Sequence, residues 1–105
     1  MSNAQVCYYR ASVQPKRSAL AIAGVREALC VAHFYVQTDD VSTCGAVGAQ
    51  FCMSRDLQHL EFLSLPQGIT PAQIAPHDAE HLRAYELALS DGVAVVISVV
   101  GVVAA

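Results

Sequence analysis

Charged residues are scarce in this chain: Asp, Glu, Lys and Arg together make up 14% of its 105 residues, against about 25% in an average protein. Tryptophan is absent, and no more than two basic residues are adjacent. The formal net charge is −3, so phosphate-directed binding to nucleic acid is not expected. Hydrophobic residues reach 54%, the opposite of a disordered composition. We therefore expect a folded domain that associates with itself or with a protein partner.

The sequence also lacks an export signal and an evident membrane helix. Residues 1–20 have no basic start followed by an apolar run. The tail Gly92–Ala105 is uncharged over 14 residues, whereas a membrane helix needs about 20. Its valines favour a buried strand, with a truncated membrane segment as the alternative. We expect a cytoplasmic protein with no membrane partner. Residues 1–4 are typical of an expression-tag remnant, which leaves residues 5–105 as one domain.

No CxxC motif occurs among the four cysteines, so zinc-ribbon and thioredoxin-type functions are excluded. Without an export signal, the thiols are expected to stay reduced. A free cysteine is commonly a small buried hydrophobe, and we expect that role for all four. They are Cys7, Cys30, Cys44 and Cys52.

Local patterns predict several strands and two helices. The segment Val41–Met53 is ambiguous: alternating apolar residues favour a strand, and a helix capped by Asp39 or Asp40 is the alternative. A Thr70-Pro71-x-Gln73 capping signature precedes the second helix, and Gly92 is a fitting stop for it. The other predicted strands are Gln5–Val13, Val31–Gln37, Gln58–Leu65 and the valine-rich tail, and the helices are Lys16–Cys30 and Pro76–Ser90.

This order of elements predicts an α+β fold of the ferredoxin-like type. A βαββαβ sandwich has an antiparallel sheet with two helices on one face, here with one possible extra strand. The tail would carry apolar side chains on both faces, which predicts a central strand or one covered in a dimer. The architecture hosts many unrelated activities, so it does not indicate a function by itself.

A histidine motif at residues 77–81 is the sharpest chemical feature. His77 and His81 are spaced to project from one helical face, where they could hold a divalent metal such as zinc. The five residues read H-x-x-E-H, which resembles the signature of inverted zinc peptidases. Those enzymes need a further carboxylate ligand well downstream, and Glu86 is the only later glutamate. We therefore predict a metal site without peptidase activity, or a plain polar helix start.

Two other histidines lie in predicted strands and are candidate general acids or bases. They are His33 and His59, each of which has an ordinary pKa near neutrality. Tyrosines could line a ligand pocket beside them with phenol groups, and we name Tyr8, Tyr35 and Tyr85 for that role.

Three functional hypotheses follow. The first is a non-catalytic, homodimeric binding module that holds a protein partner or a small apolar ligand without a cofactor. The second is a small cofactor-free isomerase or oxygenase of dimeric α+β type, with His33 or His59 as base. The third is a metal-binding protein that uses His77 and His81. A pocket with histidine beside tyrosines would favour the second hypothesis, and a featureless surface with a broad apolar patch the first.

Overall fold

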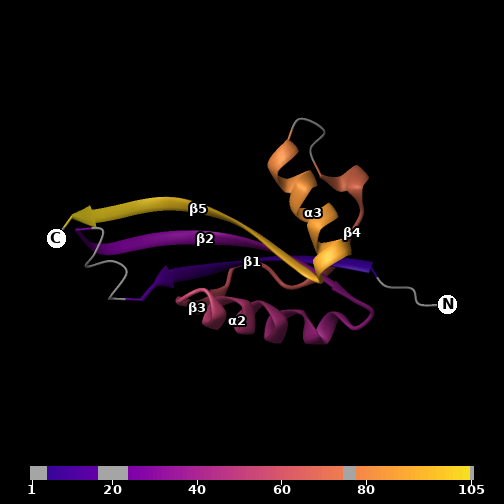
Figure 1. The fold of residues 1–105 in the computed structure, drawn as a ribbon, viewed down its shortest axis with the longest axis horizontal. Helices are drawn as coiled ribbons and strands as arrows, with labels where there is room; N and C mark the ends of the chain where they lie inside the picture. Colours follow the sequence, from indigo (N-terminus) through magenta and orange to yellow (C-terminus); the bar gives the residue numbers. More distant parts are fainter. Residues whose placement is uncertain (1–4, 17–23, 75–77, 105) are drawn as a thin grey trace.

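The computed structural model describes residues 5–16, 24–74 and 78–104, and shows an α+β fold. Two long strands form its centre, and two helices lie against them (Figure 1). The elements in chain order are β1 (Gln5–Pro15), β2 (Val25–Thr38), η1 (Val41–Thr43), α2 (Cys44–Ser54), β3 (Leu57–Phe62), β4 (Gln67–Ile69), η2 (Pro71–Gln73), α3 (Ala79–Asp91) and β5 (Val93–Ala104).

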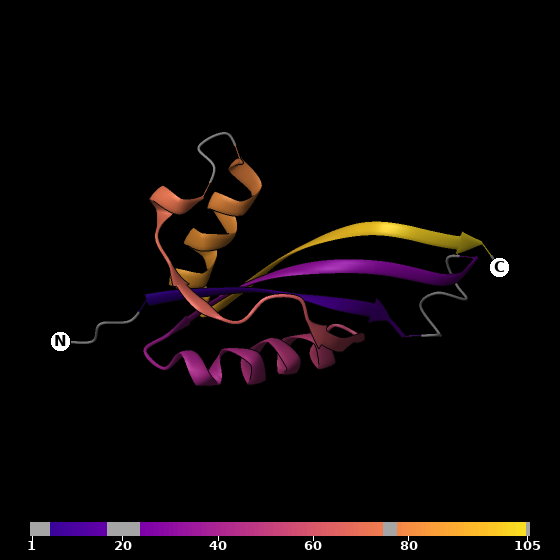
Figure 2. The same cartoon turned by 180° about the vertical axis from the view of Figure 1, so that it is seen from behind.

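All strand pairs in the sheet are antiparallel. The order is β3-β1-β2-β5, and β4 also pairs with β1. β3 and β4 follow one another along the same edge of β1, as Figure 2 shows. The predicted split βαβ arrangement is not confirmed, because such a unit joins parallel strands whereas β1 and β2 pair antiparallel.

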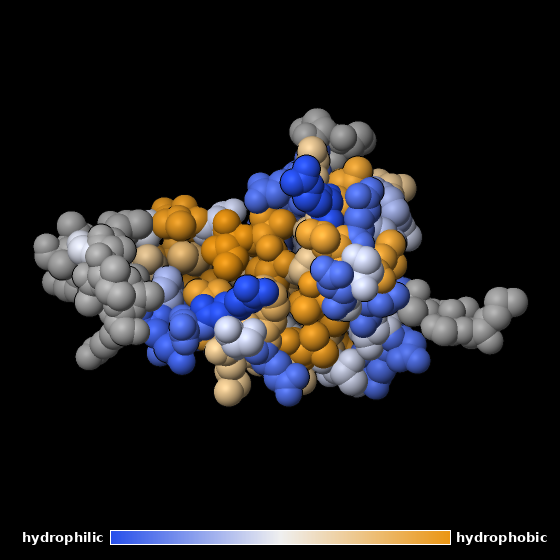
Figure 3. Space-filling view, viewed as in Figure 1, coloured by the Kyte–Doolittle hydropathy of each residue, from blue (hydrophilic) through white to orange (hydrophobic). Residues whose placement is uncertain are grey.

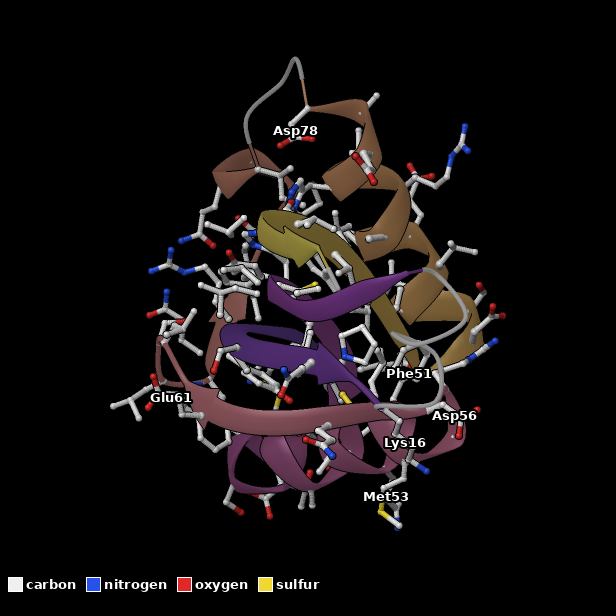
Figure 4. All side chains as sticks on the ribbon, turned by 90° about the vertical axis from the view of Figure 1, so that its left-hand side faces the viewer. Lys16, Phe51, Met53, Asp56, Glu61 and Asp78 are labelled. Carbon is white, nitrogen blue, oxygen red and sulfur yellow. The ribbon has the colours of Figure 1, made fainter. Side chains whose placement is uncertain are left out.

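The two helices cover opposite faces of the sheet, which corrects the prediction that both lie on one face. Figure 4 shows the sheet as the middle layer, with Met53 of α2 below it and Asp78 at the start of α3 above it. The reason is the period of two along a strand. Both residue sets of β1 contain buried apolar residues, so each face needs a cover: Cys7 packs in the α2-side core and Val6 in the α3-side core.

The first and last predicted strands are confirmed, but β2 is longer than expected. Residues 25–30 continue β2 and pair with β5, where the sequence pattern predicted a helix over Lys16–Cys30. Cross-strand pairing therefore overrides the helical spacing of apolar residues there. The rest of that predicted helix includes residues 17–23, which lie outside the described residues.

The ambiguous segment is helical, so the preferred strand interpretation was wrong and the alternative correct. Asp40 caps the 3₁₀ turn that leads into α2, since its carboxylate accepts a hydrogen bond from the backbone N–H of Ser42 at 3.0 Å. The buried stripe of α2 consists of Cys44, Gly48 and Cys52. These small residues at a spacing of four form a helical core face with little hydrophobic signal in the sequence.

The second predicted helix is confirmed with a later start. Asp78 caps α3 by accepting a hydrogen bond from the backbone N–H of His81 at 3.2 Å. The capping residues Thr70 and Gln73 close a separate turn, η2, ahead of the main helix, and the Thr70 N–H donates to Gln73 Oε1 at 2.8 Å. Gly92, with a φ of 92°, ends the helix in a conformation that suits glycine.

Candidate functional site

A pocket of about 290 Å³ lies on the α3 side of the sheet. Central strands β1 and β2 supply its floor, and β4, η2, Ile74 and the start of α3 supply its other lining residues. The lining residues combine aromatic, aliphatic and titratable side chains: Tyr8, His33, Tyr35, Ile69, Gln73, Ile74, Asp78 and His81.

Two hydrogen-bonded tyrosine–histidine pairs face this pocket. The hydroxyl of Tyr8 lies 2.8 Å from Nδ1 of His33, and the hydroxyl of Tyr35 lies 2.6 Å from Nδ1 of His81. The pairs are neighbours because Tyr8 and Tyr35 are register partners on β1 and β2. The two imidazole rings meet edge to face, with centroids 4.7 Å apart. The sheet register thus brings together residues that are widely separated in the sequence.

Asp78 lies beside the Tyr35–His81 pair and orients it. One carboxylate oxygen caps the helix at the His81 N–H, and the other lies 3.7 Å from Nε2 of His81. This placement favours a proton on Nε2, so that Nδ1 accepts the hydrogen bond donated by Tyr35. Carboxylate, imidazole and phenol therefore form a chain in which one group orients the next.

The protonation states of the site follow from burial. Burial lowers the pKa of His33, and the nearby His81 and Arg10 lower it further against the opposing effect of Asp78. His33 is therefore neutral at pH 7. Burial raises the pKa values of Tyr8 and Tyr35, so both phenols keep their protons. The pocket thus combines a neutral imidazole with two phenol hydrogen-bond donors.

Four of the residues singled out from the sequence meet here, whereas His59 and Tyr85 do not. His59 lies on the α2 side of the sheet, where its Nε2 is 3.2 Å from the hydroxyl of Tyr9. Tyr85 is half-buried in the α3-side core and does not line the pocket. The four residues that meet are Tyr8, His33, Tyr35 and His81.

The predicted metal pair is not tested, because His77 lies outside the described residues. Both ring nitrogens of His81 already face polar groups, Nδ1 toward Tyr35 and Nε2 toward Asp78. Within residues 5–16, 24–74 and 78–104, no group of three or more His, Cys, Asp or Glu side chains could hold a metal ion. All four cysteines are buried, as predicted, and they lie in the α2-side core.

Sequence reasoning missed Asp78 and Gln73 as members of the pocket. The available signal for Asp78 was its place at the start of an amphipathic helix, where an aspartate caps the backbone. Gln73 follows a proline in a capping signature, which indicated a helix start and not a pocket wall. Gln73 reaches the pocket from η2, and Asp78 reaches it from the N-cap of α3.

Comparisons with protein-family models, curated proteins and solved structures find no match for this chain. Neither helix of the described part is long and apolar enough to cross a membrane. The function must therefore be argued from the geometry of the pocket itself.

Proposed function

We propose that this protein is a small enzyme that moves a proton on a small organic substrate by acid–base chemistry of its own side chains. One observation carries the proposal: the Tyr8–His33 pair and the Asp78–His81–Tyr35 chain face the same pocket. Titratable groups that differ in protonation state and share a cleft are typical of acid–base sites. An isomerisation by proton transfer needs only such groups.

His33 is the proposed base. In the tautomer with the proton on Nδ1, His33 donates to the oxygen of Tyr8 across their 2.8 Å contact. That tautomer leaves the lone pair of Nε2 to take a proton from a carbon beside a carbonyl group. The Tyr8 O–H is then free to donate to the substrate oxygen on which negative charge develops. With a β,γ-unsaturated carbonyl compound the resulting dienolate also carries negative charge on its γ-carbon, and return of the proton from Nε2 to that carbon moves the double bond and completes an isomerisation.

The size and walls of the pocket restrict the substrate. A volume of about 290 Å³ is at the lower end of the range for small-molecule sites. The aliphatic side chains of Ile69 and Ile74 add an apolar surface to a pocket that also holds the polar groups of Tyr8 and His33. This favours a compact carbonyl compound with a short hydrocarbon part.

The proposal is tested by proton exchange in D₂O. The protein is incubated with a panel of small ketones and aldehydes, and deuterium incorporation beside the carbonyl is followed by NMR. We expect exchange with at least one compound, and a loss of about 100-fold or more in His33→Gln. His59→Gln is the matched control, because His59 is also half-buried but lies on the other face. Exchange that is absent throughout the panel, or equal in the two variants, contradicts the proposal.

A homodimeric, non-catalytic binding module is the second candidate. Its support is a set of large apolar side chains that are exposed in the single chain, such as Leu29 at 53% and Val100 at 63%. In that case the pocket holds a small apolar ligand without changing it. Binding of cyclohexanone, seen as shifts of the His33 ring signals, with no deuterium exchange would favour this candidate.

A further inference from the structure

The two edges of the sheet are protected to different degrees. One edge carries the short strands β3 and β4, and Glu61 is exposed on β3. The other edge is β5, whose outer side pairs with no other strand in the described part of the chain. β5 has 12 residues without a charge or a proline, about twice the mean strand length. Edge strands usually avoid pairing by being short, charged or interrupted by proline, and β5 has none of these protections.

Apolar side chains follow this open edge. Ala94 and Val96 are buried under α3, but beyond them Ile97 is 41% exposed and Val99 is 62% exposed. A single copy therefore does not give the tail the burial on both faces that its sequence predicts. Figure 3 shows apolar side chains gathered along the course of β5, bordered by hydrophilic ones.

A groove of about 420 Å³ lies along the first four residues of β5. Val93–Val96 form its floor, and Leu87 adds an apolar wall from α3. The charged residues around it balance one another: Arg55 and Arg83 against Glu80 and Asp91. A groove without net charge fits an uncharged strand better than an acidic or a basic peptide.

We infer that this edge binds β5 of a second copy, so that two sheets join into one. β5 is itself the uncharged, β-branched strand that the groove and the apolar edge fit. Antiparallel pairing of a strand with itself has twofold symmetry, so each residue of the interface is used twice. This inference does not depend on the function proposed for the pocket.

The exposed residues select a register. If Ser98 lies on the twofold axis, Ile97 pairs with the partner's Val99, and Val99 pairs with the partner's Ile97. An axis perpendicular to the sheet keeps these side chains on one face, where β-branched pairs pack well. The second copy thus gives Ile97 and Val99 apolar cross-strand neighbours that a single chain does not provide.

Cross-linking tests the register. Residues that face each other across an antiparallel pair are close enough for a disulfide, so Ser98→Cys should form a covalent dimer on mild oxidation. The native thiols should not interfere, because all four are at most 4% exposed. Ser54→Cys, an exposed serine at the end of α2, is the matched control and should stay monomeric on a non-reducing gel. Equal cross-linking of the two variants overturns the inference.

Sedimentation tests the interface itself. The unmodified protein should sediment as a dimer at micromolar concentration, and Val99→Lys should raise its dissociation constant by 100-fold or more, since each added charge would lie against the partner's Ile97 and lose its water there. Met53→Lys, which adds the same charge at a 73% exposed position of α2, should leave the dimer intact. A monomeric unmodified protein at 100 µM overturns the inference. If Val99→Lys does not fold, the cross-linking pattern still decides.

Discussion

Adjacent residues of the central strands have opposite environments on the two faces of the sheet. Tyr9 is fully buried on the α2 side, stacked on Phe34 with ring centroids 4.7 Å apart. Tyr8, one residue earlier, faces the pocket on the α3 side and contacts His33. The same residue type therefore packs in a core on one face and lines a pocket on the other.

The covering helices explain this difference. α2 presents glycine and cysteine to the sheet, and at Gly48 the absence of a side chain lets the Tyr9 hydroxyl reach the helix backbone. α3 buries only Ala84 and Ala88. Its first turn, with His81, forms a pocket wall in place of a tight contact. Close packing by small residues thus produces an apolar core, and the looser approach of a polar helix start produces a site.

The close packing of α2 on the sheet should be most sensitive to a side chain at Gly48. In Gly48→Ala the new methyl group would overlap the Tyr9 hydroxyl and lie 3.1 Å from Cδ1 of Phe34. Both neighbours are fully buried, so we expect a loss of about 2 kcal/mol in the free energy of unfolding, measured with urea. Gly45→Ala is the matched control. Its methyl meets only the ring of Phe62, which is 48% exposed and can move. A loss as large in the control would contradict this account of α2 packing.

The two adjacent tyrosines should respond differently when their hydroxyl groups are removed. Tyr9→Phe removes the hydrogen bond to His59 and should cost about 1 kcal/mol in the free energy of unfolding. Tyr8→Phe should cost less stability, because Tyr8 is only half-buried, but should remove the proton exchange proposed for the pocket. Urea unfolding and the exchange assay on both variants check this. An inactive Tyr9→Phe with an active Tyr8→Phe would reverse the assignment of the faces.

Acid should weaken the folded state through histidines on both faces. Burial lowers the pKa of His33 and also that of His59, where a backbone hydrogen bond opposes the effect. In the unfolded chain both histidines bind protons near pH 6.5. Their contribution to stability is therefore complete above that pH and is lost as pH falls toward the folded pKa values.

Urea unfolding at pH 7.5 and pH 5.5 measures this loss. We expect the difference in the free energy of unfolding between pH 7.5 and pH 5.5 to shrink in His33→Gln and in His59→Gln, and to shrink further in the double variant. If the double variant retained the full difference in the free energy of unfolding, neither histidine would be responsible for the loss of stability in acid.

The smallest effect is expected on the surface, away from both faces. Lys16 Nζ lies 3.3 Å from Asp56 Oδ1, and the two side chains are 49% and 77% exposed; Figure 4 shows them side by side. Because water and salt screen such a pair, Lys16→Ala should change the free energy of unfolding by less than about 0.5 kcal/mol. A loss above about 1 kcal/mol in thermal or urea unfolding would contradict this.

The strand pattern predicted much of the site but not its assembly. Alternation identified Gln5–Val13 as a strand, and aromatic and β-branched content identified Val31–Gln37. The side-chain chemistry of Tyr8, Tyr35 and His33 made them candidates. It could not show that His33 meets His81 while His59 does not, because that depends on which strands pair and which face each helix covers. These are long-range properties that a local pattern does not carry.

The errors in the fold have a related cause. The helix over Val41–Met53 was predicted less strongly than a strand because its buried face consists of cysteine and glycine. The extension of β2 over residues 25–30 depends on a partner strand about 70 residues later, since Leu29 pairs with Gly101. In both cases the tertiary partner decides the local structure.

The pairing of β2 with β5 also affects how the chain folds during synthesis. β2 ends at Thr38, and its partner begins only at Val93. On the ribosome, one edge of β2 therefore stays unpaired while residues 39–92 are made. Strand pairs of such long separation form slowly and leave apolar edges open to aggregation meanwhile. A chaperone that covers Val31–Val36 during translation should therefore raise the yield of folded protein, more so at higher rates of expression.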